Sequence, residues 1–424
     1  MSGRRALYGW LTATAISLVG SRLSMLALPW FVLTTTGSAT KTGLVALAEM
    51  APMVVLKVLG GPIIDRVGPR RVSIVCDLGS AAAVGAIPLL HAADLLAFPL
   101  FLAVVAVSGA FMGPGDAAKN AMIPMLVEQA RVPTERATGL SSMIERGAGM
   151  FGAAIGGGLI ALWGAPTALL VDAGSFLFCA ALLAWATAGL GRVGGADDDT
   201  APYGQRLAQG WRFLRGDRVL VGIAVMVTLT NLIDIAMSAV LMPVWAHESG
   251  AGIGSLGLVF AVMAGFSAAG SGVAAAYAAR LPRYSTYLVA FLVCGAPRFL
   301  VLAVEAPLAV VLAVFAVAGF ASGFLNPVLG AVELERIPAH LVGRVTSLMT
   351  AACFALMPFG GLLGGGLVAW LGLSAALVVC GAGYFVVTMF PAVDPTWKEI
   401  DRRPSTDAAD LPAGSHPGGT QSAP

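Results

Sequence analysis

The sequence predicts an all-α membrane protein in which twelve transmembrane helices form two parallel halves of six helices each. Three features of the 424 residues support this prediction: an apolar composition, twelve apolar runs of membrane-spanning length, and an internal repeat. Hydrophobic residues make up 58% of the chain and charged residues 11%, whereas a soluble domain carries about 25% charged residues. Too few polar side chains remain to cover a water-soluble particle of this size.

A helix needs about 20 mainly apolar residues to cross a bilayer. Applied along the chain, this length gives six spans in the first part, at about 8–34, 42–64, 73–91, 95–115, 137–162 and 166–190. It gives six more in the second part, at about 218–245, 253–279, 285–304, 307–332, 343–370 and 372–394.

Basic residues set the expected orientation, because loops on the cytoplasmic side of a membrane are enriched in Lys and Arg. With a cytoplasmic N-terminus, 20 of the 25 Lys and Arg residues fall in cytoplasmic segments, only Lys41 falls in an outer loop, and the rest lie within spans. We therefore expect an inner-membrane protein with both termini in the cytoplasm.

Two glycine-rich runs show the internal repeat. Three glycines of the fifth span match three of the eleventh, each pair 208 residues apart: Gly152 and Gly360, Gly156 and Gly364, Gly157 and Gly365. Because the matching segments are the fifth and eleventh spans, the two halves have six spans each and the same orientation. Secondary transporters are often built from such repeats and bind their substrate between them.

The repeat divides the chain into a first half (1–190), a linker (191–217), a second half (218–394) and a tail (395–424). Between Arg206 and Arg218 the linker alternates basic and apolar residues, which predicts an amphipathic helix on the cytoplasmic membrane surface. The tail is rich in Pro, Gly, Ser and Asp, a composition typical of disorder.

The loop after the second span reads Gly61-Pro-Ile-Ile-Asp65-Arg66-Val-Gly68-Pro-Arg70-Arg71. It resembles the signature G-x-x-x-D-R-x-G-R-[RK] that the major facilitator superfamily carries between its second and third spans, with Pro69 in place of the usual basic residue. Three shorter stretches resemble sequences of the macrolide-efflux and enterobactin-exporter branch: Thr36-Gly37-Ser38, Asn120 to Val127 and Asn326-Pro327. The resemblance covers about residues 15–390 and implies the twelve-helix fold of that superfamily.

Charged side chains within spans are costly, so they usually face a cavity or a partner. The first, second, fourth and fifth spans of each half line the cavity in the superfamily. The resemblance therefore assigns substrate binding and proton coupling to Arg22, Glu49, Asn231 and Asp234. Arg22 is expected to pair with either carboxylate or to meet an anionic substrate group. A lower-ranked set lies on peripheral helices or near the inner vestibule: Glu145, Arg146, Asp172 and Arg298.

The resemblance also assigns a conformational gate to the loop after the second span. Its residues are Gly61, Asp65, Arg66, Gly68, Arg70 and Arg71, together with Asp77 and Asp116. Gly61 has no Cβ, so the second span is expected to approach the eleventh closely there, with Asp65 beside residues 342–344 when the gate is closed. In the same closed state Arg70 or Arg71 is expected to bond Asp116, and Asp77 is expected to pair with loop arginines.

Drug antiporters of the superfamily often carry a fifth-span motif that ends in G-P-x-x-G-G. This chain has Gly152-Ala153-Ala-Ile-Gly156-Gly157, without the proline. Two interpretations remain open: a variant of the antiporter motif, or small residues that serve helix packing alone.

The expected function is that of a secondary active transporter that exports an amphipathic small molecule, such as a drug, a siderophore or a secondary metabolite, by proton antiport. Its expected partners are the substrate, protons and membrane lipid, with the protein acting as a monomer. A net charge of +2 gives no reason to expect nucleic acid. No metal site is expected, because the His and Cys residues lack ligand spacing. No enzyme activity or cofactor is expected, because the sequence contains no phosphate-binding P-loop and no catalytic pattern. The alternatives are nutrient uptake on the same fold and a non-transporting membrane enzyme or scaffold of a biosynthetic pathway.

Overall fold

The computed structural model describes residues 2–132, 134–188, 203–277, 282–338 and 341–401, and these hold helices and no β-strand. The helices are α1 (Ser2–Thr36), α2 (Ala39–Leu59), α3 (Gly61–Val67), α4 (Pro69–Ala92), α5 (Phe98–Ala121), α6 (Ile123–Ala130), α7 (Thr134–Ala186), α8 (Tyr203–Gly216), α9 (Arg218–Ala236), α10 (Met242–Glu248), α11 (Gly252–Tyr277), α12 (Arg283–Cys294), α13 (Ala296–Ala303), α14 (Leu308–Ser322), α15 (Leu325–Arg336), α16 (Val342–Ala355), α17 (Met357–Leu371) and α18 (Leu373–Met389). A π-helical turn (Met237–Leu241) joins α9 to α10, and two 3-10 turns (Phe390–Ala392 and Pro395–Asp401) follow α18.

The described part of the chain accounts for twelve membrane crossings. Eleven helical segments in it are long and apolar enough to span a bilayer. One of these, α7, contains two crossings, because Gly164 has φ 81° and breaks the helix between the fifth and sixth predicted spans. A positive φ of this kind is accessible to glycine without strain. The predicted all-α fold of twelve spans in two halves is therefore confirmed.

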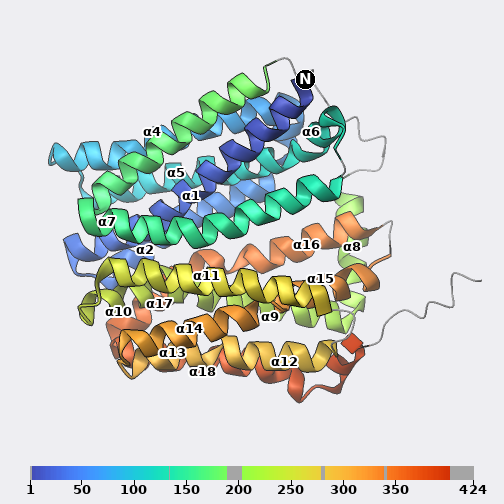
Figure 1. The fold of residues 1–424 in the computed structure, drawn as a ribbon. Helices are drawn as coiled ribbons and strands as arrows, with labels where there is room; N and C mark the ends of the chain where they lie inside the picture. Colours follow the sequence, from blue (N-terminus) through green and yellow to red (C-terminus); the bar gives the residue numbers. More distant parts are fainter. Residues whose placement is uncertain (1, 133, 189–202, 278–281, 339–340, 402–424) are drawn as a thin grey trace, which may run out of the picture.

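The two halves lie side by side, with α1–α7 in one layer and α9–α18 in the other (Figure 1). Two helix pairs join the halves: α2 packs against α17, and α7 packs against α11. We call the end of the bundle that carries Arg4, Arg66, Arg71 and Arg212 the basic end. The other end, at Ser38 and Ser249, is the opposite end.

The matched glycines make equivalent contacts in the two halves. A Cβ at Gly152 would meet α1 at Arg22 Cβ (2.9 Å), and one at Gly360 would meet α9 at Ile235 Cβ (2.6 Å). A Cβ at Gly157 would lie 2.7 Å from Gly257 Cα in the other half, and one at Gly365 would lie 2.7 Å from the carbonyl oxygen of Ala39. The third pair is equivalent too: Gly156 packs against α1, and Gly364 packs against the seventh span. Packing therefore accounts for all six residues.

Several spans of the second half are interrupted, which the sequence did not predict. The seventh span contains the π-helical turn, and the eleventh is broken between α16 and α17. Pro358 lies just after that second break and removes a backbone donor. Thr228 Oγ1 donates to the Ala352 carbonyl (2.9 Å) and Asn231 Nδ2 to the Cys353 carbonyl (3.0 Å), so α9 satisfies acceptors at the break.

The start of the tail is ordered, which corrects the prediction of disorder from residue 395. Residues Pro395–Asp401 form a 3-10 turn whose Trp397 is 3% exposed. The indole packs 5.6 Å from the ring of Tyr287, over Gly222, where a Cβ would lie 2.7 Å from the indole. The amino-acid composition of the tail does not reveal that Trp397 anchors it, because the two apolar side chains in this turn are outnumbered by polar residues. Residues 402–424 lie outside the described part.

Candidate functional site

A cavity of about 350 Å³ lies between the two halves. From α1 and α7 come Arg22, Met25, Leu26, Gly149 and Ala153. The second half supplies the other lining residues: Asn231, Asp234, Ile235, Met237, Ser238, Met242, Phe260, Met263, Ala264, Ser267, Arg298, Phe315, Ser322 and Met357. Its volume lies in the range of small-molecule sites.

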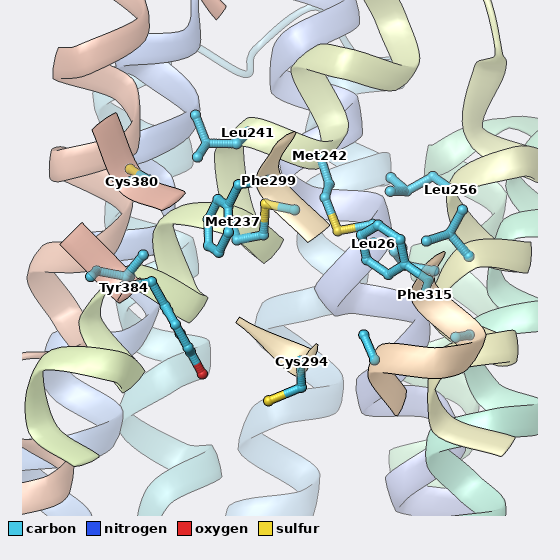
Figure 2. Packing of buried hydrophobic residues seen from close by; sticks show 14 of the residues in the cluster. Leu26, Met237, Leu241, Met242, Leu256, Cys294, Phe299, Phe315, Cys380 and Tyr384 are labelled. Carbon is cyan, nitrogen blue, oxygen red and sulfur yellow. The ribbon is translucent and has the colours of Figure 1, made fainter. Parts of the chain in front are cut away.

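The apolar part of the lining is rich in methionine and aromatic side chains. Figure 2 shows Leu26 of α1 beside Met242, Phe315 and Leu256 of the second half, within one packed cluster. Methionine has three rotatable bonds and a polarisable sulfur, so it adapts to ligands of different shapes. Five of the lining residues are methionines. This surface suits amphipathic molecules of varied structure rather than one rigid ligand.

An ion pair forms the polar part of the cavity wall. Arg298 Nη2 donates to Asp234 Oδ1 at 3.0 Å, and Tyr384 Oη donates to Asp234 Oδ2 at 3.4 Å. The Arg298 side chain is 7% exposed and that of Asp234 is 38% exposed. The carboxylate is thus the accessible member of the pair. Figure 2 shows Tyr384 next to Met237 and Phe299.

A second cavity of about 210 Å³ shares Asp234 and Arg298 with the first. It is also lined by Leu325, Asn326 and Leu329 of α15, which lie toward the basic end. The ion pair therefore borders both cavities.

Arg22 lines the cavity but pairs with neither Asp234 nor Glu49, so the other expected role, contact with an anionic substrate group, stays a prediction. Its guanidinium donates to Met25 Sδ at 3.6 Å. Arg298 already holds Asp234, and Glu49 does not belong to the cavity lining. Arg22 is therefore a cation that faces the cavity without a carboxylate partner among the described residues.

Glu49 and Asp172 form a separate acidic group inside the first half. Glu49 is half-buried, and the two carboxyl groups are close enough to interact electrostatically. Asp172 is fully buried and accepts hydrogen bonds from Ser24 and Ser175, the second at 3.1 Å. Ser24 is two residues from the cavity residue Arg22, so the two point to different faces of α1. Glu49 is therefore not among the residues that line the cavity between the halves in this conformation.

The remaining lower-ranked residues divide between the site and the surface. Arg298 is expected from the sequence to be a structural residue of a peripheral span. It lines both cavities and is bonded there to Asp234. Glu145 is exposed. The side chain of Arg146 lies outside the described part of the chain.

The gate loop is exposed at the basic end. Asp65, Arg66 and Arg71 are exposed, and a Cβ at Gly61 would have no neighbour within 4 Å. The expected close approach of the second and eleventh spans at Gly61 is therefore absent in this conformation. Gly68 has φ 94° and turns the chain from α3 into α4, a conformation that favours glycine.

In this conformation Arg70 and Asp77 have other partners, while the bond to Asp116 expected in the closed state stays a prediction. Arg70 Nε donates to Thr187 Oγ1 (2.8 Å) and Arg70 Nη2 to the Ala184 carbonyl (3.0 Å), so it ties the loop to the end of the sixth span rather than to Asp116. Asp77 pairs with Lys119 Nζ at 2.7 Å instead of a loop arginine. Asp116 lies near enough to Lys119 and Lys57 to interact with both charges.

Lys119 and Tyr384 are the residues that sequence reasoning missed. Lys119 is 5% exposed and also donates to Ser17 Oγ at 2.9 Å. A fourth span that ends at about residue 115 places this lysine in a loop, whereas α5 continues to Ala121. The spacing of Asp116 and Lys119, three residues apart, is the signal that places both on one helix face. Tyr384 has no comparable signal in the sequence.

Comparisons with known proteins agree with this architecture. The family model "Major Facilitator Superfamily" matches residues 10–238 and 224–414. The multidrug efflux pump Tap of Mycobacterium tuberculosis is 32% identical over 420 residues, covering 98% of this chain and 99% of that protein. Tap of Mycolicibacterium fortuitum is 29% identical over 403 residues, covering 93% and 96%.

A solved structure shows the same fold. A mutant form of the nucleoside transporter NupG superposes with a TM-score of 0.73, covering 91% of this chain and 98% of that one at 13% identity. With the family match spanning both halves, the chain is a multi-pass membrane protein that belongs to the major facilitator superfamily.

Proposed function

We propose that this protein exports amphipathic small molecules from the cytoplasm in exchange for protons. The observation that carries the proposal is the methionine-rich cavity between the halves, with a half-exposed carboxylate in its wall. Near full-length similarity to two multidrug efflux pumps supports the direction and the substrate class. In this proposal the protein is a monomer of the inner membrane, with its basic end and both termini in the cytoplasm.

Asp234 is the proposed proton carrier. When it is ionised, it holds Arg298 at 3.0 Å. A proton on the carboxyl group removes the charge that attracts the guanidinium, so Arg298 is freed toward the cavity. Protonation of Asp234 therefore changes the charge and the contacts of the cavity wall, and in this proposal that change links proton binding to substrate movement. Glu49, deeper in the first half, is proposed as a second titrating group.

The test is transport by purified protein in liposomes under an imposed pH gradient, with a fluorescent lipophilic cation as the probe. Asp234→Asn keeps the shape of the side chain but cannot carry a proton. We expect it to abolish gradient-driven transport while probe binding in the absence of a gradient remains. Glu49→Gln is measured in parallel.

Two outcomes contradict the proposal. Gradient-driven transport by Asp234→Asn at the wild-type rate and pH dependence removes Asp234 from the coupling. Probe accumulation in the direction of proton flow identifies an importer instead. Glu145→Gln, on an exposed site away from the cavity lining, is the matched control and is expected to transport normally.

A further inference from the structure

A groove of about 460 Å³ lies outside the bundle, between the basic ends of α9 and α18. Its walls carry Val225, Met226 and Leu229 from α9, and Val386 and Phe390 from the last span and the turn that follows it. Val225 is 53% exposed, Val386 65% and Phe390 58%. Both helices lie within membrane-spanning segments, so the groove opens laterally toward lipid.

Two arginines stand at the end of the groove nearest the basic end. Arg215, the last basic residue of α8, lies with its guanidinium 5.9 Å from the centre of the Trp211 ring. Arg218 begins α9. Both are exposed, and neither makes an ion pair within 4 Å with a described residue.

One acidic group, Asp394, also borders the groove. Its Oδ1 accepts hydrogen bonds from Thr396 Oγ1 (2.7 Å) and Thr396 N (3.0 Å). These bonds lower the pKa of Asp394, with the charge of Arg218 as a smaller cause. Its carboxylate is ionised at neutral pH, so the mouth of the groove carries two positive charges against one negative charge.

We propose that this groove binds one anionic phospholipid of the cytoplasmic leaflet, with its phosphate between Arg215 and Arg218 and an acyl chain along α9 and α18. Basic pockets between helices at the cytoplasmic surface are suited to anionic headgroups. A soluble phosphate would use the arginines but not the apolar walls, whereas a phospholipid uses both. The proposal rests on the proposed orientation, which places the basic end in the cytoplasm.

The site joins three parts of the protein. Arg215 belongs to the linker helix α8, Arg218 to the seventh span, and Phe390 follows the twelfth. Between the two arginines, Asp217 caps α9 through Val219 N (2.9 Å) and also binds Arg336 Nε (2.8 Å). A bound lipid would therefore stabilise the junction at which the linker enters the second half.

Lipid binding to the full-length protein can be measured by native mass spectrometry and by thermal unfolding in phosphatidylcholine nanodiscs that contain added lipid. The probes are phosphatidylglycerol and phosphatidylethanolamine with the same acyl chains. Wild-type protein is expected to retain one phosphatidylglycerol in preference to phosphatidylethanolamine and to unfold at a higher temperature with it. The Arg215→Gln/Arg218→Gln variant is expected to bind phosphatidylglycerol about tenfold more weakly, a loss of about 1.4 kcal/mol.

Two further variants separate this site from general charge effects. Arg4→Gln/Arg131→Gln removes the same charge from exposed positions of the first half and is expected to bind phosphatidylglycerol like the wild type. Val225→Trp fills the groove from a lipid-facing position and is expected to lose binding with both arginines intact. Equal binding of both lipids by wild type, an equal loss in the Arg4/Arg131 control, or full binding by Val225→Trp would each overturn the proposal. None of these outcomes depends on transport, so they leave the export proposal untouched.

Discussion

At the scale of single residues, the most consequential contact is the buried ion pair between Lys119 and Asp77. Its side chains are 6% and 3% exposed, and Ser17 provides a third partner. Trp10 Nε1 also donates to the carbonyl of Lys119 at 3.1 Å, which fixes α1 against α5. Removal of one charge from such a pair leaves the other buried and uncompensated.

Lys119→Gln is therefore expected to destabilise the protein by about 3–5 kcal/mol, the usual cost of breaking a buried pair. The measurement is the apparent unfolding temperature of detergent-purified protein, together with the yield of monodisperse protein. Asp77→Leu/Lys119→Met, which removes both charges, is expected to recover most of the loss. Lys41→Gln, at an exposed site, serves as the control. If Lys119→Gln were as stable as Lys41→Gln, the pair would carry no structural role.

Sequence alone identifies the costly charges but not their partners. Arg22, Asp234 and Arg298 are recognisable because ionised groups are rare within spans. Their pairing is not, because it depends on how each helix is rotated about its axis and on contacts between distant segments. Asp234 and Arg298 are 64 residues apart on the seventh and ninth spans. No periodic pattern of residues within either span indicates that the two side chains meet.

At the scale of helices, glycines determine where the two halves meet. Gly157 faces Gly257, and Gly361 lies over Gly43, where a Cβ at Gly361 would be 2.7 Å from the Gly43 carbonyl oxygen. Both contacts lie toward the opposite end, so backbones of the two halves touch there. Close approach of this kind requires small residues.

Gly157→Val is expected to force the halves apart at the opposite end. Overpacking of a tight contact costs about 1–3 kcal/mol, and about 1.4 kcal/mol changes a population tenfold. In a background without the five native cysteines, a cysteine in place of the cavity residue Ser238 is expected to react about tenfold faster with an impermeant thiol reagent added from the opposite end.

Gly158→Val is the matched control, because a Cβ there meets nothing within 4 Å. It is expected to leave the reactivity of the Ser238 position unchanged. Equal reactivity in Gly157→Val and Gly158→Val would show that the glycine contact does not hold this end closed.

The helices themselves were predictable, but their interruptions were not. Long apolar runs show where the chain crosses the membrane, because the thickness of the bilayer sets the minimum length of a spanning helix. The π-helical turn after Asp234 lies where the seventh span packs against the eleventh. Gly364 allows that contact at Val240, where a Cβ would lie 3.1 Å away. Such local geometry follows from tertiary contacts, which the pattern of apolar residues does not encode.

At the scale of the whole molecule, the two ends differ. The halves touch through glycines at the opposite end, whereas the gate loop at the basic end is exposed around Asp65. From these contacts and the proposed orientation we infer that this is an inward-facing state. Transport requires a second state in which the opposite end opens and the basic end closes. The contacts of Asp65 in that second state are a prediction from the resemblance, since its side chain is exposed in the state described here.

The last prediction concerns the balance between these two states. Asp65→Asn is expected to leave the inward-facing state unchanged, because the side chain is exposed there. In the closed state a carboxylate near the start of α16 would be favoured by the helix dipole, by about 0.3–1 kcal/mol and up to about 2 kcal/mol when partly buried. A loss of about 1.4 kcal/mol would shift the population tenfold toward the inward-facing state. Turnover should then slow while substrate binding is retained.

Spin labels at Ile63 and Thr350, both exposed near the basic end, measure the distance between the second and eleventh spans. In Asp65→Asn the long-distance population is expected to grow at the expense of the short one. Asp94→Asn changes an exposed acid near the opposite end and should leave the distribution as in the wild type. Because the helix-dipole contact exists only in the closed state, an unchanged distribution in Asp65→Asn across pH would mean that Asp65 has no role in the gate.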